Sequence, residues 1–128
     1  MSDVFVLDAS ALLCLLQSEP GGERVADVLP RSIIGAVNLS EVVAKLADAG
    51  GTLPQIGAAI DGLQLKVTPF DAQLAMIAGS LRPTTRSIGL SLGDRACLAL
   101  GLSRNAVVLT CDRDWAKLKI DLAIEVLR

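Results

Sequence analysis

Short apolar runs recur along the chain, and each is followed by a segment with helical periodicity. Residues 4–7 (Val-Phe-Val-Leu) are four consecutive apolar positions, two of them β-branched, which is typical of a short strand buried on both faces. Four further runs, at 32–35, 65–67, 106–110 and 123–127, predict four more strands. Strands that alternate with helices predict an α/β fold, a three-layer α/β/α sandwich with a mainly parallel central sheet.

Helices are expected between these strands. Their N-caps are predicted at Ser10, Asn38, Asp71 and Ser91, residue types whose side chains accept hydrogen bonds from the first free backbone N–H groups of a helix. The basic stretch at 82–87 (Arg-Pro-Thr-Thr-Arg-Ser) is predicted to be a loop. The expected helices cover residues 11–16, 23–29, 38–49, 53–63, 72–81 and 91–103, with a turn at 111–115 leading into a short helix through residue 118.

The length and the composition favour one domain, over residues 1–128. Hydrophobic residues make up 52% of the chain but aromatic ones only 2%, so Ala, Leu, Val and Ile must fill the core. No apolar run approaches the roughly 20 residues that span a bilayer, and the N-terminus lacks the basic start of a signal peptide. We therefore expect a cytoplasmic protein without membrane association.

The chain contains no histidine, which narrows the chemistry available to it. A Ser-His-Asp or Cys-His site, a His-ligated zinc and His acid–base catalysis are excluded. The three cysteines, Cys14, Cys97 and Cys111, lie in apolar patterns without metal-ligand spacing and are expected to be buried reduced thiols. A net charge of −2 argues against loose polybasic binding of nucleic acid. Carboxylates, hydroxyls, Lys or Arg, or a hard metal ion must carry any reaction.

Two acidic residues directly follow apolar strands. Asp8 ends the first run, and Asp112 comes just after the fourth. Parallel strands end at the same edge of a sheet, where α/β proteins bind their ligands, so the two carboxylates are expected to converge. The alternative for Asp8 is that it only caps the helix or turns the chain.

Two more acids lie near helix starts. Asp94 shares a helix face with apolar residues three, four and seven positions on, so its side chain is expected to point inward; its alternative is a capping pair with Ser91. Glu41 lies in the first turn of a helix that follows a strand. Its alternatives are a capping box with Asn38 and an ion pair with Lys45 one turn away.

Four carboxylates in one partly buried cleft would repel one another. A divalent cation relieves that repulsion, and carboxylate and water oxygens are the ligands that Mg²⁺ and Mn²⁺ prefer. The sequence is therefore compatible with a hard-metal site.

Four segments carry these acids: 6–12 (Val-Leu-Asp-Ala-Ser-Ala-Leu), 38–42 (Asn-Leu-Ser-Glu-Val), 92–100 (Leu-Gly-Asp-Arg-Ala-Cys-Leu-Ala-Leu) and 109–115 (Leu-Thr-Cys-Asp-Arg-Asp-Trp). Together they resemble the acidic motifs of PIN-domain ribonucleases. The segment at 93–96, Gly-Asp-Arg-Ala, and the short length resemble the VapC-type toxins of bacterial and archaeal toxin–antitoxin pairs.

The resemblance implies that Asp8, Glu41, Asp94 and Asp112 are catalytic and that Asp8, Asp94 and Asp112 hold Mg²⁺ or Mn²⁺. It also implies that Ser10 and Thr110 are supporting hydroxyls. Asp114 is an extra acid near the fourth segment, so whether Asp112 or Asp114 lies closer to the metal stays open.

The activity implied by the resemblance is hydrolysis of RNA phosphodiester bonds by a metal-activated water, in the toxin of a toxin–antitoxin pair. The implied partners are a cognate antitoxin, an RNA substrate and a second copy of the chain in a homodimer. Four arginines are candidate contacts to the RNA backbone: Arg82, Arg86, Arg95 and Arg113.

Two other function classes remain open from the sequence. A phosphoryl-transfer domain would use Asp8 as a covalent nucleophile, although haloacid-dehalogenase-like phosphatases have a second acid where this chain has Ser10. A response-regulator receiver also has acids near a strand end, but the 109–115 segment lacks the matching Lys. The other class is a non-catalytic module that binds protein or nucleic acid and uses its acids as structural caps.

Overall fold

Five parallel strands form the centre of the molecule. The structure is a computed structural model that describes residues 4–128. The strand order is β3-β2-β1-β4-β5, and every neighbouring pair is parallel. The predicted α/β sandwich is confirmed, and its sheet is parallel throughout. The strands are β1 (Phe5–Leu7), β2 (Ser32–Gly35), β3 (Lys66–Thr68), β4 (Val107–Thr110) and β5 (Ile124–Val126).

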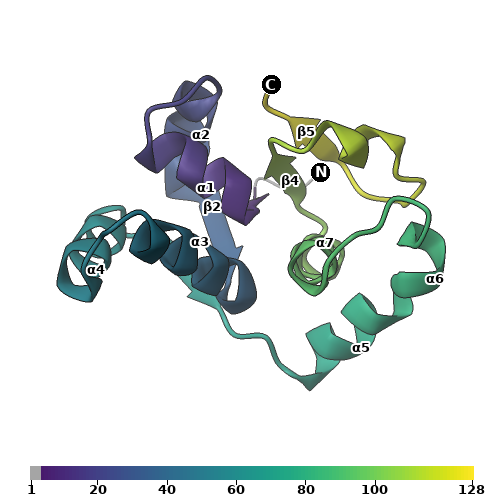
Figure 1. Cartoon of the computed structure of the whole chain (residues 1–128). Helices are drawn as coiled ribbons and strands as arrows, with labels where there is room; N and C mark the ends of the chain where they lie inside the picture. The colour runs from purple at the N-terminus through teal and green to yellow at the C-terminus, as the bar shows by residue number, and fades with distance from the viewer. Residues whose placement is uncertain (1–3) are drawn as a thin grey trace.

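One face of the sheet is covered by the N-terminal helices (Figure 1). Phe5 and Leu7 of β1 point to this face, together with Ile34 of β2 and Leu109 of β4, which lie beside Leu7 in the sheet. Leu12 and Val42 pack onto them from two of the helices. The covering helices are α1 (Ala9–Leu16), α2 (Gly22–Val28) and α3 (Ala36–Asp48).

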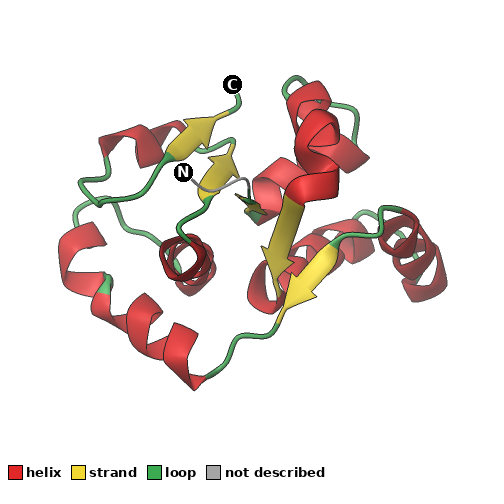
Figure 2. Cartoon of the chain, turned by 180° about the vertical axis from the view of Figure 1, so that it is seen from behind, coloured by secondary structure: helices red, strands yellow, loops and turns green. Residues whose placement is uncertain are grey.

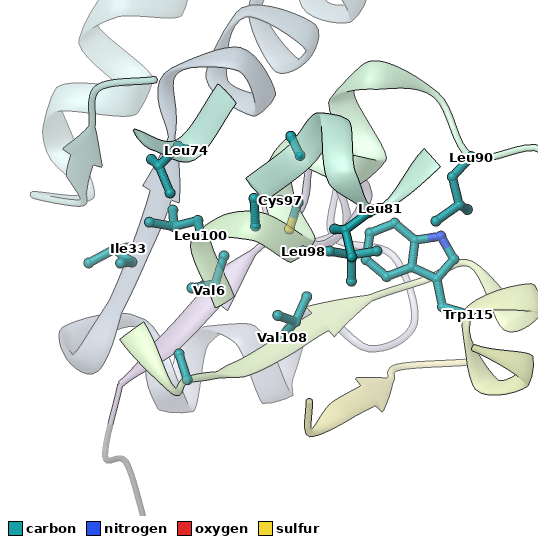
Figure 3. Packing of buried hydrophobic residues seen from close by; sticks show 13 residues of the cluster. Val6, Ile33, Leu74, Leu81, Leu90, Cys97, Leu98, Leu100, Val108 and Trp115 are labelled. Atoms are coloured by element: carbon teal, nitrogen blue, oxygen red, sulfur yellow. The ribbon is translucent and has the colours of Figure 1, made fainter. Parts of the chain in front are cut away.

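The opposite face carries the second half of the chain. Val6, between Phe5 and Leu7, points to this face because successive strand residues alternate sides. Helices α5 (Ala72–Ser80) and α7 (Leu92–Arg104) cover it. Figure 3 shows Val6 and Val108 beneath Leu98 and Leu100 of α7, with the indole of Trp115 beside Leu81 and Leu98. Both faces are buried, which explains the continuous apolar runs of β1 and β4.

The chain reverses its direction of travel across the sheet between β3 and β4. From β1 it moves outward through β2 to β3, then crosses back to place β4 on the other side of β1 and β5 beyond it. Figure 2 shows the helices arranged around these strands. The gap between β1 and β4 at their carboxyl ends is therefore the switch point of the fold, where open parallel sheets bind ligands. Asp8 and Asp112 follow these two strands.

One sequence prediction, the loop at 82–87, is wrong. The 82–87 stretch was expected to be a loop, but Arg82–Thr85 form the helical turn α6. Pro83 lies in its first turn, where a missing N–H costs nothing, and both its N-cap Leu81 and its last residue Thr85 are buried. The other elements are α4 (Leu53–Gly62) and the 3-10 turns η1 (Leu29–Arg31) and η2 (Arg113–Lys117). Within residues 4–128, no helix has the length and apolar character needed to cross a membrane.

Two of the four predicted N-caps were wrong. Asp8, not Ser10, caps α1, because its carboxylate lies where it accepts the Ala11 N–H. Helix α3 begins at Ala36 rather than at Asn38, since Gly35 at the end of β2 already supplies the extended residue before the helix. Asp71 and Ser91 cap α5 and α7 as predicted.

Candidate functional site

Asp8 stands at the exit of the central strand with its carboxylate almost entirely buried. Only 5% of the residue is exposed. Its Oδ1 accepts hydrogen bonds from the Ser10 hydroxyl at 2.6 Å and from the Ala11 N–H at 2.8 Å, and its Oδ2 accepts one from the Thr110 hydroxyl. Each carboxylate oxygen has two lone pairs, so Oδ2 retains one that can bind a ligand.

Burial raises the pKa of Asp8 from 3.8 to about 6. The low-polarity surroundings disfavour the charged carboxylate, and the three hydrogen bonds compensate only in part. The negative charge of Asp94 raises the pKa further. A buried acid with a perturbed pKa at the edge of a sheet is a typical functional-site candidate.

Ser10 and Thr110 join the ends of β1 and β4. Ser10 Oγ accepts the Cys111 N–H at 2.9 Å, and Thr110 Oγ1 accepts the Asp112 N–H at 3.1 Å, while both hydroxyls donate to Asp8. These bonds fix the two strand ends relative to each other. The supporting role that the resemblance implies for these two hydroxyls in the site stays a prediction.

Glu41 comes from the second turn of α3. The amide Nδ2 of Asn38, which is 1% exposed, donates to Glu41 Oε1 at 2.9 Å and to Gly93 O at 3.0 Å. Neither alternative for Glu41 from the sequence appears: the bond to Asn38 joins two side chains and is no capping box, and the ion pairs found in residues 4–128 do not include Lys45. Glu41 is thereby held against the start of α7.

Asp94 lies half-buried in the first turn of α7. Asp94 Oδ2 accepts the Ser91 N–H at 3.0 Å, and Ser91 Oγ accepts the Asp94 N–H at 3.1 Å, a complete capping box. The capping alternative is therefore present, yet the Asp94 side chain also lines the same cleft as Asp8. One carboxylate serves both as a cap and as part of the cleft.

Asp112 and Asp114 occupy different places. Asp112 is exposed, caps η2 by accepting the Asp114 N–H, and lines the cleft. Asp114 pairs with Lys117 at 3.0 Å and lines a separate surface hollow with Ser87 and Ile88. In the described chain it is Asp112, rather than Asp114, that faces the other acids.

The four acids line one cleft of about 240 Å³. They come from four different parts of the fold. Burial raises the pKa of the Cys97 thiol, and the negative charges of Asp8, Asp94 and Glu41 raise it further. Lys45 is the one cation among the residues between 4 and 128 that line this cleft. With Asp8 ionised, the cleft carries four negative charges against one positive charge.

The donor types of the cleft fit a hard divalent cation. Four carboxylates, without histidine or thiolate, are the ligand set of Mg²⁺ or Mn²⁺ rather than of zinc. In the described part of the chain, however, no three acidic or thiol side chains lie close enough together to hold one ion. Each carboxylate of the cleft instead has a local partner: Ser10 and Thr110 for Asp8, Asn38 for Glu41, Ser91 for Asp94 and the Asp114 N–H for Asp112.

The four arginines expected to contact RNA do not line the cleft. Arg95 donates to Ala78 O at 3.1 Å and ties α7 to α5, and Arg113 donates to the backbone oxygen of Arg128 at 3.1 Å. Arg82 and Arg86 are exposed at α6. Their contacts to RNA stay a prediction.

Three residues of the cleft region were missed by sequence reasoning. Asn38 was assigned only as a helix cap, Lys45 only as a partner of Glu41, and Gly93 only as part of a motif. The spacing of Asn38 and Glu41 fits one helix face, but no local signal reveals that α7 crosses there. Lys45 carried a usable signal, because it lies one turn from Glu41 on that same face.

Comparison with known proteins shows where this fold occurs elsewhere. The model of the PIN domain family matches residues 5–121. No curated protein matches the sequence significantly. One similar chain, in VapBC2 from Rickettsia felis bound to a DNA fragment from their promoter, has a TM-score of 0.77 at 15% identity, over 98% of this chain and 99% of that one.

Two further structures share the fold at low identity. A chain of VapBC-1 from nontypeable Haemophilus influenzae has a TM-score of 0.74 at 23% identity, covering 97% of this chain and 98% of that one. A chain of DNA-bound VapBC from Salmonella typhimurium has a TM-score of 0.73 at 22% identity, covering 98% of both chains. With the family match over nearly the whole length, the four-acid cleft and the parallel sheet have a common explanation: this chain belongs to the PIN domain family.

Proposed function

We propose that the protein is a Mg²⁺- or Mn²⁺-dependent endoribonuclease that acts as the toxin of a toxin–antitoxin pair. The observation that carries this proposal is the cleft itself, which is lined by acids that follow β1 and β4 and by acids of α3 and α7, at the switch point of the sheet. The PIN family match supports a nuclease, and the absence of histidine is compatible with metal-dependent hydrolysis.

Asp8, Asp94 and Asp112 are proposed to hold the metal, with Glu41 as a further ligand or as the group that orients the attacking water. When bound, the divalent cation lowers the pKa of a water molecule and offsets negative charge on the phosphodiester. Ser10 and Thr110 keep the Asp8 carboxylate in one orientation through their hydrogen bonds. Asp94 Oδ1 is not used by the capping box, which engages only Oδ2.

The toxin role is supported by the folds that this chain resembles. Several of the similar chains come from complexes described as VapBC or as a toxin–antitoxin complex. We accordingly propose a cognate antitoxin as the partner, a homodimer as the assembly and the cytoplasm as the location. These likenesses are below 25% identity and concern the fold, so the partner is inferred from family membership and from the charge of the cleft.

Purified protein is expected to cleave cellular RNA in the presence of Mn²⁺ or Mg²⁺ and to lose this activity in EDTA. The same cations should raise the melting temperature, because they relieve repulsion between Asp8 and Asp94 only in the folded state. Sequencing of the cleaved ends identifies the preferred site. Zinc should not substitute, since the cleft offers neither histidine nor thiolate.

A melting temperature indifferent to millimolar Mn²⁺, together with intact RNA, would overturn this proposal. RNA cleavage that proceeds fully in EDTA would contradict the metal dependence alone. A covalent phosphate on Asp8 would support the phosphoryl-transfer alternative instead, and mass spectrometry of the intact protein detects it directly.

Lys45 is proposed to contact an RNA phosphate at the rim of the cleft. Its side chain is exposed and has no ion-pair partner among the described residues. Lys45→Ala is expected to raise KM for RNA several-fold, a loss of about 1 kcal/mol for one phosphate contact, while Mn²⁺ binding stays equal or tightens as a nearby positive charge disappears. Lys66→Ala, an exposed lysine outside the cleft, is the matched control. An unchanged KM and an unchanged salt dependence of binding would exclude this contact.

A further inference from the structure

The carboxylate of Glu41 lies flat against the backbone of α7 at Gly93. A Cβ atom built on Gly93 would lie 2.3 Å from Glu41 Oε2 and 2.6 Å from both Oε1 and Cδ. All three distances are far below van der Waals contact. Gly93 is buried within the first turn of α7, and its φ is not among the positive values that would themselves require glycine. A side chain at residue 93 and the present position of the Glu41 carboxylate therefore exclude each other.

The Asn38 amide completes the arrangement from the other side. Its two Nδ2 protons are shared between Glu41 Oε1 and the carbonyl oxygen of Gly93 itself. Asn38 is 1% exposed, and its Oδ1 has no hydrogen-bond partner among the described residues.

We propose that Gly93 and Asn38 are positioning residues that together fix the Glu41 carboxylate in the acidic cleft. Gly93 leaves the space and Asn38 supplies the donor. The amide binds only Oε1, and the described chain offers Oε2 no hydrogen-bond donor, so Oε2 stays available to a ligand. Among the described residues, Glu41 forms no ion pair with Lys45, its neighbour one helical turn on. This inference rests on the proposed function for what Glu41 does once it is in place.

The test is the variant Gly93→Ala, studied with Glu41→Gln and with the double variant. A methyl group at residue 93 must displace the Glu41 carboxylate, which is the far end of a flexible side chain, so the fold should tolerate the change. Gly57→Ala in α4 is the matched control, because a Cβ there meets nothing within 4 Å. Both are Gly→Ala changes within helices. In EDTA, Gly57→Ala should leave the melting temperature equal or slightly higher, whereas Gly93→Ala should leave it equal or slightly lower, because the Asn38 amide loses its bond to Glu41.

The first measurement is the side-chain amide signal of Asn38 in the ¹⁵N-correlated NMR spectrum of the metal-free protein. In Gly93→Ala one Nδ2 proton should move upfield, because its bond to Glu41 is lost, while the proton bonded to the residue 93 carbonyl should stay. Gly57→Ala should leave both protons in place. An unchanged Asn38 signal in Gly93→Ala would overturn the proposal.

The second measurement is the affinity for Mn²⁺, by calorimetry. Gly93→Ala should weaken it by about 10-fold to 100-fold, the usual cost of losing a residue that orients a metal ligand, and Gly57→Ala should not change it. In the Glu41→Gln background the substitution at Gly93 should have no further effect, because both changes act on the same carboxylate.

If Gly93→Ala lowered the Mn²⁺ affinity of the Glu41→Gln variant as much as it lowers that of the wild-type protein, the proposal would be overturned, because Gly93 would then act independently of Glu41. If the wild-type protein bound no Mn²⁺ while the Asn38 signal still moved, the positioning role would stand and the metal-dependent function would fall. The two measurements therefore separate the failure of one from the failure of the other.

Discussion

The Asp8→Asn variant is expected to lose RNA cleavage by about 100-fold or more, because it removes a carboxylate proposed to hold the metal ion that would stabilise charge at the reacting phosphate. The same variant should not be unstable without metal at neutral pH. The amide is almost the same size as the carboxylate, and its oxygen can still accept the Ala11 N–H that caps α1. Loss of activity without loss of stability distinguishes a functional acid from a structural cap.

The pH dependence of stability gives this variant a second signature. In the unfolded chain Asp8 releases its proton near pH 3.8, whereas in the folded protein it holds the proton until about pH 6. Between these values the unfolded state alone becomes charged at this position, so the wild-type protein loses stability as the pH rises, and the loss is complete above the folded pKa. At 1.36 kcal/mol per pKa unit, the loss amounts to about 3 kcal/mol.

The side-chain amide of Asp8→Asn does not titrate. Relative to the wild-type protein, the free energy of unfolding of the variant should therefore rise by up to about 3 kcal/mol between roughly pH 4 and pH 7. Urea unfolding in EDTA across this range measures the difference directly. Asp61→Asn is the control, because Asp61 is exposed at the end of α4. A difference that stays constant with pH would show that the Asp8 pKa is not raised in the folded protein.

The sheet was predictable because burial of both faces leaves a direct trace in the sequence. A strand covered on two sides is mostly apolar, so β1 (Phe5–Leu7) and residues 107–109 of β4 are continuous apolar runs, and Thr110 follows at the strand end. Asp8 and Asp112 interrupt that pattern at the strand exits, and parallel pairing then places both at one edge. The convergence of these two acids follows from the strands alone.

The positions of Glu41 and Asp94 depended on tertiary structure. From the sequence, each has a complete local explanation: an ion pair for Glu41 and a capping box for Asp94. Only the crossing of α3 and α7 shows whether each side chain makes that local interaction, lines the cleft, or does both. For Asp94 the local bond exists beside the cleft. For Glu41 the long-range contact with Gly93 and the bond to Asn38 replace the ion pair. The prediction of a loop at 82–87 was wrong for a similar reason. The local composition favours a loop, but burial of Leu81 and Thr85 favours a helical turn.

Expression of the chain alone is expected to stop bacterial growth, and expression of Asp8→Asn at the same level should permit it. An endoribonuclease without its inhibitor degrades RNA that the cell needs, whereas the Asn variant keeps the fold and lacks the activity. Immunoblotting confirms equal amounts of the two proteins. Normal growth with the wild-type chain and intact cellular RNA would exclude the toxin role while leaving the PIN fold unaffected.

A small co-encoded protein should restore growth by occupying the acidic cleft. Among the described residues that line the cleft, four acids outweigh the one cation, Lys45. An arginine of the partner can bind a carboxylate there through two parallel charge-assisted hydrogen bonds. Such an arginine competes with the metal for the same oxygens. Millimolar Mn²⁺ should therefore weaken the complex measured by calorimetry, and replacing the inserted arginine with lysine should weaken it as well, since lysine offers no planar fork. A complex of the same affinity with and without Mn²⁺ would place the partner away from the cleft.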